Sequence, residues 1–279
     1  MIRKIKDGFM FGLIYLSAFF SVLLLAGIIG YVFARGLPAV SWPFLTTVKS
    51  VIKGTAGIAG NIINTVYIVV LTLAIAVPVG IGSAVWLNEY AGRGRVVNLI
   101  EFATETLSGI PSIVFGLFGM VFFGTTVGLG YSILTGALTL TLMILPLITR
   151  NTQEALRAVP ASYRSGAIGM GATKWYMIRT VLLPAAMPGI VTGILLAIGR
   201  IIGESAALLF TAGSGYLLPD LGKGLLNKIM ESGGTLAIQL YLSMSGAEYE
   251  TAFGIAAVLL CIVFLFQLLV KLIARRHCR

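Results

Sequence analysis

Long runs with almost no charged residue alternate with short polar segments along this chain. A helix that crosses a bilayer needs roughly 20 consecutive apolar residues, and each of these runs is long enough. The run at 106–149 is too long for one crossing, and its glycines near 124–130 divide it into expected crossings near 108–123 and 131–149. Six transmembrane helices are therefore predicted. The runs span residues 8–34, 54–88 (membrane part near 61–87), 106–149, 184–211 and 251–273.

The composition excludes a soluble globular domain. The chain is 58% hydrophobic and 11% charged, with a mean hydropathy of +0.99, which leaves too little polar surface to cover a water-soluble fold. Backbone groups inside hydrocarbon must satisfy their own hydrogen bonds, so the predicted fold class is all-α. The first run is longer than the roughly 7–15 apolar residues of a signal-peptide core, which predicts an uncleaved first span.

The basic residues set the expected orientation. The formal net charge is +10, but Lys and Arg fall in short clusters between the apolar runs, so no nucleic-acid binding is expected. Most of the 20 Lys and Arg residues lie in the N-terminal segment, the second and fourth connections and the C-terminal tail. Cytoplasmic segments of membrane proteins carry this excess, which predicts that both termini are cytoplasmic.

The segment between the fourth and fifth spans is predicted to form a helix, a glycine corner and a second helix. Pro160 has the backbone angle of a helix start, which predicts a short helix over 160–170. Gly171 can take the left-handed conformation that ends this helix. Thr173 is a predicted N-cap for a second helix over 174–182, ahead of the fifth span.

Two roles are open for this segment. Its small residues leave the first helix thin enough for a groove on another protein, where Tyr163, Met170 and Trp175 would anchor it and Arg164 would add a charge contact. Alternatively, the segment lies on the membrane surface as an amphipathic loop, helped by Lys174, Trp175 and Arg179. The residues alone do not choose between the two. The small residues are Gly166, Ala167, Gly169 and Gly171.

Arg200 and Glu204 are the ionisable residues expected deep within the fifth span. A charge at the bilayer centre costs roughly 2.5–3.5 kcal/mol on insertion scales, so it needs a partner or a water-filled cavity. Four residues apart on one helix, the two would share a face and could neutralise each other. Arg200 suits phosphate oxygens because its guanidinium donates hydrogen bonds in a planar fork, and Glu204 would hold or oppose it. The alternative is a structural ion pair without substrate contact.

Other chemistry is sparse in this sequence. Glu101 and Glu105 precede the third span, where an interfacial position near Arg93 and Arg95 is favoured over a metal or proton site. The single histidine, His277, excludes a histidine-based triad and a multi-histidine metal site. The chain has no P-loop of the GxxxxGKS or GxxxxGKT type. No catalytic or metal-ligating residue is therefore expected, and the chain cannot hydrolyse ATP alone.

The connection between the fourth and fifth spans reads Ser165-Gly166-Ala167, then Gly171, then Val181-Leu182-Leu183-Pro184. This pattern resembles the signature of bacterial ABC importer permeases, in which an acidic residue and two alanines precede a glycine and an Ile-x-Leu-Pro ending. Ser165 stands in place of the acidic residue. Four longer segments are similar to the PstA-type permease subunit of the phosphate-specific ABC importer: residues 64–91, 107–119, 154–213 and 235–242.

The resemblance implies a type I ABC importer permease fold with six transmembrane helices in the inner membrane, and import of inorganic phosphate. The alternatives are another oxyanion, such as molybdate or sulfate, and a non-transporting scaffold or signalling subunit. The implied partners are a homologous permease that completes a heterodimer, two ATPase subunits that use ATP and Mg, and a periplasmic phosphate-binding protein; no cofactor is expected on this chain. The resemblance places the substrate pathway at Arg200 and Glu204. The implied ATPase-coupling residues are Tyr163, Arg164, Ser165, Gly166, Ala167, Gly171 and Trp175.

The expected organisation has three parts. Residues 1–57 hold an N-terminal tail, the first span and an external loop; residues 58–275 form the permease core; residues 276–279 are a cytoplasmic tail. Within the core lie the coupling segment, about 154–183, and the external segment 213–250. The external segment would help to dock the binding protein, or serve as a flexible connector with a re-entrant turn.

Overall fold

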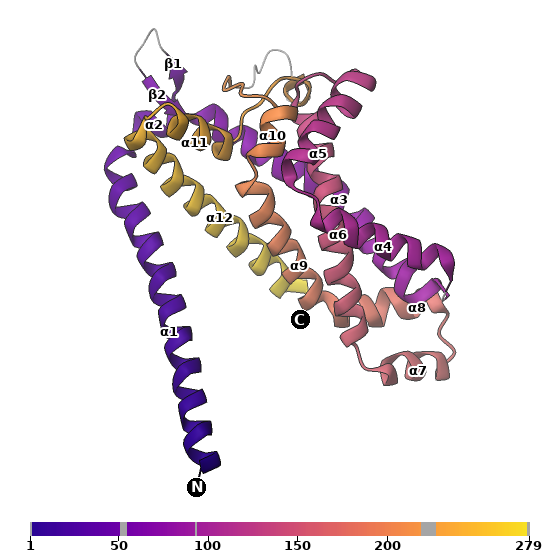
Figure 1. The fold of residues 1–279 in the computed structure, drawn as a ribbon. Helices are drawn as coiled ribbons and strands as arrows, with labels where there is room; N and C mark the ends of the chain where they lie inside the picture. Colours follow the sequence, from indigo (N-terminus) through magenta and orange to yellow (C-terminus); the bar gives the residue numbers. More distant parts are fainter. Residues whose placement is uncertain (1, 51–54, 93, 219–226, 278–279) are drawn as a thin grey trace.

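Helices make up most of the computed structural model, which describes residues 2–50, 55–92, 94–218 and 227–277. Within this part, five helices are long and apolar enough to cross a membrane, and one bent helix pair gives a sixth crossing when counted as one span. The predicted all-α, six-span architecture is confirmed (Figure 1). The five are α1 (Ile2–Gly36), α3 (Ala59–Val85), α6 (Ile133–Ala158), α9 (Leu183–Gly203) and α12 (Tyr249–His277).

Short elements connect these spans. Between α1 and α3, an antiparallel hairpin pairs β1 with β2, with Val48 opposite Ile58. This hairpin was not predicted. The connecting elements are η1 (Leu37–Ala39), α2 (Trp42–Thr46), β1 (Val48–Ser50), β2 (Thr55–Ile58), η2 (Trp86–Tyr90), α7 (Ala161–Gly169), α8 (Lys174–Met177), η4 (Ile178–Leu182), α10 (Ala206–Thr211), η5 (Asn227–Met230) and α11 (Leu236–Ser245).

The third span is the bent pair, and its bend has a local cause. It consists of α4 (Arg95–Gly109), then α5 (Ser112–Gly119) and its π-helical continuation η3 (Met120–Thr126), with 105° between the two parts. Ile110 is extended at φ −74° and ψ 131°, as the residue before a proline prefers. The apolar part of the crossing therefore begins at Ser112, a few residues later than the expected 108.

The fifth span differs from its predicted limits at both ends. A continuous helix runs from Lys174 to Gly203, so the predicted separate helix over 174–182 is the first part of the span. Pro184 causes no break because the preceding turn is π-helical, with Leu183 N–H donating to the carbonyl of Ile178 five residues back. At the other end the helix stops at Gly203 and not at 211, and α10 begins separately.

The apolar core lies where α3, α6, α9 and α10 meet. Ile68 of α3, Ile144 of α6, Ile198 of α9 and Leu208 of α10 are all buried in one cluster. By contrast, none of the hydrophobic window of α1 is buried. This helix touches α12 near Tyr31, whose ring meets that of Phe253 edge-on at 5.7 Å, and diverges from α12 toward the N-terminus (Figure 1).

One of the two glycine pairs on α9 is a packing device. A side chain at Gly189 would meet Ala155 Cβ at 2.6 Å, and one at Gly193 would meet Asn151 Cβ at 2.7 Å, so both glycines let α9 approach α6 closely. Gly199 and Gly203 face open space within the described chain. The same gly-xxx-gly spacing thus marks a close helix contact at the first pair and, within the described chain, none at the second.

Replacing Gly193 with valine should destabilise the α6–α9 contact by about 1–3 kcal/mol, since a tightly packed interface resists added side-chain volume. The measurement is the thermal unfolding midpoint of the purified chain in detergent. Gly199→Val is the matched control, because the same change on the same helix meets no neighbour. Equal midpoints for the two variants would contradict a close contact at Gly193.

The segment 213–250 is anchored to α3 at several described positions. The Asn61 side-chain amide donates to the carbonyl of Gly234 at 3.0 Å, and Leu236 N–H donates to the Thr65 hydroxyl at 3.0 Å. Lys228 is buried and donates to the carbonyl of Leu217 at 2.9 Å. These contacts make the described part a packed element rather than a flexible connector. Residues 219–226 lie outside the described part.

Candidate functional site

The corner between α7 and α8 is a helix-ending motif built on Gly171. Gly171 has φ +83°, the left-handed region that glycine enters without a steric penalty. Gly171 N–H donates to the carbonyl of Ile168 at 2.9 Å, and Ala172 N–H donates to that of Ala167 at 3.0 Å. This is the Schellman pattern, which satisfies the last carbonyls of a helix. The predicted glycine corner is confirmed.

The second helix begins as predicted. The Thr173 hydroxyl accepts a hydrogen bond from Tyr176 N–H at 3.3 Å, so Thr173 is its N-cap. Lys174 Nζ lies 4.9 Å from the centre of the Tyr90 ring, a cation–π contact that links the start of α8 to the end of η2. The corner therefore has a defined shape and a defined attachment to α3.

Most of the predicted coupling residues lie on the exposed side of this corner. Tyr163, Ser165, Gly166, Gly171 and Trp175 are exposed. Met170, which was expected to act as an anchor, is 85% exposed, the most open of the large apolar residues described here. Exposed aromatic and thioether side chains beside small residues form a surface suited to a partner groove. Whether they contact an ATPase stays a prediction.

Two of the predicted coupling residues face inward. Ala167 is buried in an apolar cluster with Leu156, Met177 and Ile178. Arg164, expected to meet a partner, contacts its own chain instead. Its Nη2 atom lies 2.8 Å from Glu89 Oε1 and 2.9 Å from the carbonyl oxygen of Leu156.

Sequence reasoning missed Glu89, the acid that receives Arg164. The Glu89 side chain is only 7% exposed, and its Oε1 also accepts a hydrogen bond from the Asn88 amide at 2.7 Å. The available signal was its position at the end of the second apolar run. With the predicted orientation, this end lies on the same side of the membrane as the connection between the fourth and fifth spans. From the sequence alone, a charged residue at the end of a span is expected to lie exposed at the membrane surface, because the helix that packs on it is not known.

Arg200 and Glu204 do not form the expected pair. Arg200 is exposed in α9 and makes no hydrogen bond or ion pair with any described residue. Glu204 lies past the helix end, half-buried, and its Oε1 accepts from Ala207 N–H at 3.0 Å. The i, i+4 argument fails because α9 ends at Gly203. The result is a guanidinium on a mainly apolar helix, without a partner in the described part of the chain, and a carboxylate that accepts a hydrogen bond at the start of α10.

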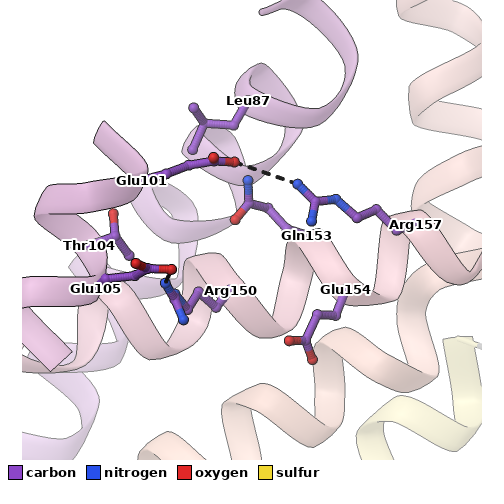
Figure 2. A pocket seen from close by; sticks show the side chains of 8 residues that line it. All are labelled: Leu87, Glu101, Thr104, Glu105, Arg150, Gln153, Glu154 and Arg157. Carbon is purple, nitrogen blue, oxygen red and sulfur yellow. Dashed lines mark ion pairs between the residues drawn. The ribbon is translucent and has the colours of Figure 1, made fainter. Parts of the chain in front are cut away.

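Glu101 and Glu105 lie within α4 and pair with arginines of α6; Arg93, near which they were expected, lies outside the described residues. Figure 2 shows Glu101 reaching Arg157 and Glu105 reaching Arg150, with N···O distances of 3.6 Å and 2.6 Å. The Gln153 side chain lies between the two ion pairs. Together they line an open pocket of about 200 Å³. All four charged partners are substantially exposed, so these pairs hold two helices in register more than they stabilise the fold.

Known proteins similar in sequence to this chain are membrane components of transport systems. The sequence profile of the family described as binding-protein-dependent transport system inner membrane component matches residues 76–277. A probable ABC transporter permease protein, YqgI of Bacillus subtilis (strain 168), is 41% identical over 213 residues, which cover 76% of this chain and 72% of that protein. The phosphate transport system permease protein PstA of Xylella fastidiosa (strain Temecula1) is 37% identical over 179 residues, 64% of this chain and 62% of that protein.

A solved structure shows the same fold. One chain of a bacterial alginate ABC transporter, in complex with an alginate pentasaccharide-bound periplasmic protein, superposes with a TM-score of 0.70. The superposition covers 98% of this chain and 96% of that chain at 14% sequence identity. At this identity the likeness concerns the fold.

Proposed function

The chain belongs to the family of binding-protein-dependent transport system inner membrane components, and from that premise we propose that it is the permease subunit of an ATP-driven ABC importer of inorganic phosphate. Membership and the apolar spans make it a multi-pass inner-membrane protein. The phosphate assignment is supported by the PstA relative, whose name states phosphate transport.

The observation that carries the proposal is Arg200, which is exposed in a membrane-spanning helix and has no ion-pair or hydrogen-bond partner among the described residues. An unpaired guanidinium at membrane depth is costly unless it faces water, a partner or a substrate anion. Its fork of donors fits a tetrahedral oxyanion, and an oxyanion bound by one such group can still be released. Glu204, four residues after Arg200 and in the break between α9 and α10, would limit how tightly the anion is held.

The importer needs subunits beyond this chain. A homologous permease would complete a heterodimer and cover the side of α9 that carries Arg200. Two ATPase subunits would bind ATP and Mg and dock on the corner between α7 and α8, and a periplasmic phosphate-binding protein would deliver the substrate. With both termini in the cytoplasm, α7 and α8 lie on the ATPase side, and the anchored segment 213–250 lies on the opposite side.

Transport would follow from two arrangements of the spans. ATP binding in the partner subunits favours one arrangement and hydrolysis the other, which requires that docking contacts at α7 differ between the two. Division of the chain into residues 1–57, the core 58–275 and the tail 276–279 is part of this proposal, with coupling assigned to about 154–183.

ATP-dependent uptake of labelled phosphate into vesicles that carry the whole complex tests the proposal. We expect uptake that unlabelled phosphate suppresses and that excess sulfate or molybdate leaves unchanged. Suppression by sulfate or molybdate instead would replace the substrate and keep the importer. Assembly of the complex without transport of any of the three would favour a scaffold or signalling subunit.

A further inference from the structure

We propose that Glu89, through its ion pair with Arg164, transmits the position of α7 to the end of α3 and thereby couples ATP hydrolysis to transport. Glu89 is a positioning residue in this scheme, since it touches neither substrate nor nucleotide. The inference rests on the proposed function, because coupling has a meaning only if an ATPase docks on α7.

The first argument is how little else holds α7. In this helix of nine residues, Ala167 is the buried one, so apolar packing fixes the helix at essentially one point. Arg164 supplies the second attachment, and it is polar and directional. With one point of attachment, α7 could rotate about that point without moving α3. With two, a displacement of α7 is passed on to the end of α3.

The second argument is the geometry of Arg164. Its Nε and Nη2 atoms converge on one Glu89 oxygen at 3.3 Å and 2.8 Å. Its Nη1 donates to the carbonyl of Val159 at 3.1 Å, and Nη2 also donates to that of Leu156 at 2.9 Å. These carbonyls lie at the C-terminal end of α6, where a cation is favourable. One side chain of α7 thus joins the ends of two spans.

The third argument is the element that receives the contact. Glu89 and Tyr90 both belong to η2, a π-helical turn that closes with Ala91 N–H donating to the carbonyl of Trp86. Glu89 binds α7, and Tyr90 lies under Lys174 of α8. Both helices of the docking corner therefore hold the same turn, and π-helical turns are frequent at functional sites.

The contact between Glu89 and Arg164 is connected through packed helices to the proposed substrate pathway at Arg200. η2 continues α3, which packs with α6 and α9 in the apolar core, and α9 carries Arg200. Close-packed helices move as bodies rather than deform. A weaker branch leads outward, since Asn88 accepts from Arg157 Nε at 3.4 Å and Arg157 pairs with Glu101 of α4.

The test compares Glu89→Gln, Arg164→Lys and the double variant in the assembled complex, reconstituted in vesicles. The quantity measured is phosphate imported per ATP hydrolysed, together with the amount and thermal midpoint of the assembled complex. Glu105→Gln is the matched control. It makes the same change in another acid that pairs with an arginine, but this arginine, Arg150, belongs to α6 and the pair does not touch α7.

We expect each single variant to lower the ratio of uptake to hydrolysis between about 2-fold and about 30-fold, the range of coupling changes along such contacts. The double variant should be no worse than the poorer single one, because the two residues act as one unit. Glu105→Gln should keep the ratio of the unaltered complex.

A normal ratio in assembled Glu89→Gln and Arg164→Lys complexes would overturn the inference, as would losses that multiply in the double variant or an equal loss in Glu105→Gln. If Glu89→Gln does not assemble, Arg164→Lys decides, because it keeps the charge and loses the fork. Failure of both to assemble would assign the pair to architecture alone. An unaltered complex that imports no phosphate would instead overturn the proposed function.

Discussion

Arg200→Gln is expected to reduce phosphate uptake to the level of vesicles without the complex, while the ATPase subunits still co-purify with the chain. Glutamine keeps much of the length of the side chain but loses the charge and the five-donor fork that match an oxyanion. Arg200 is exposed and has no partner among the described residues, so its removal leaves no buried group unsatisfied. The loss would therefore be in transport and not in folding. Uptake and co-purification are measured on the same preparations.

Arg179→Gln is the control for this result. Arg179 is also exposed and lies on the same continuous helix, which runs from Lys174 to Gly203, but toward its other end. The Arg179→Gln variant should retain phosphate uptake if the loss in Arg200→Gln depends on the depth of Arg200 in the membrane and not on positive charge anywhere on this helix. Normal uptake by Arg200→Gln would remove Arg200 from the pathway, and loss of ATPase co-purification would show that the variant acts through assembly.

Gly171→Val is expected to abolish co-purification of the ATPase subunits. The left-handed conformation at φ +83° costs a residue with a Cβ atom roughly 1–2 kcal/mol, and a β-branched side chain tolerates it least. Relief of this strain turns the backbone to negative φ, which breaks the hydrogen bonds that end α7 and changes the angle between α7 and α8. The exposed residues on the two helices would then no longer form one surface.

Gly171→Asn separates backbone conformation from side-chain size at the same position. Asparagine enters the left-handed region far more readily than valine, and a side chain at this position meets open space within the described chain. We therefore expect Gly171→Asn to retain ATPase co-purification. Stable co-purification with Gly171→Val would refute the role of the corner in docking, and equal loss in both variants would point to steric exclusion by the partner.

Local signals in the sequence were sufficient for the corner. Gly171 ends one helix and Thr173 caps the next because a left-handed turn and an N-cap depend on residues within four positions of each other. The bend before Pro111 also has a local cause, because the residue before a proline prefers an extended backbone. The predicted pair of Arg200 and Glu204 failed because it assumed an unbroken helix, whereas α9 ends at Gly203.

The partners of the charged residues could not be predicted from the sequence, for a different reason. Arg164 finds Glu89 at a separation of 75 positions, and Arg157 finds Asn88 at 69. Several acids and arginines lie near the ends of the spans, and their charges alone allow many pairings. Only the packing of α3, α6 and α7 brings particular ones within hydrogen-bonding distance.

The sequence by itself determined the membrane as solvent, the six spans and the glycine corner, because apolar length and local capping are properties of neighbouring residues. The tertiary structure decided which way each charge points. It turned Arg164 inward to Glu89, left Arg200 exposed on α9 and gave Glu204 to the start of α10. The physical reason is that a charged side chain takes whichever partner the packed helices place within about 3–4 Å, and that distance exists only after the helices have packed.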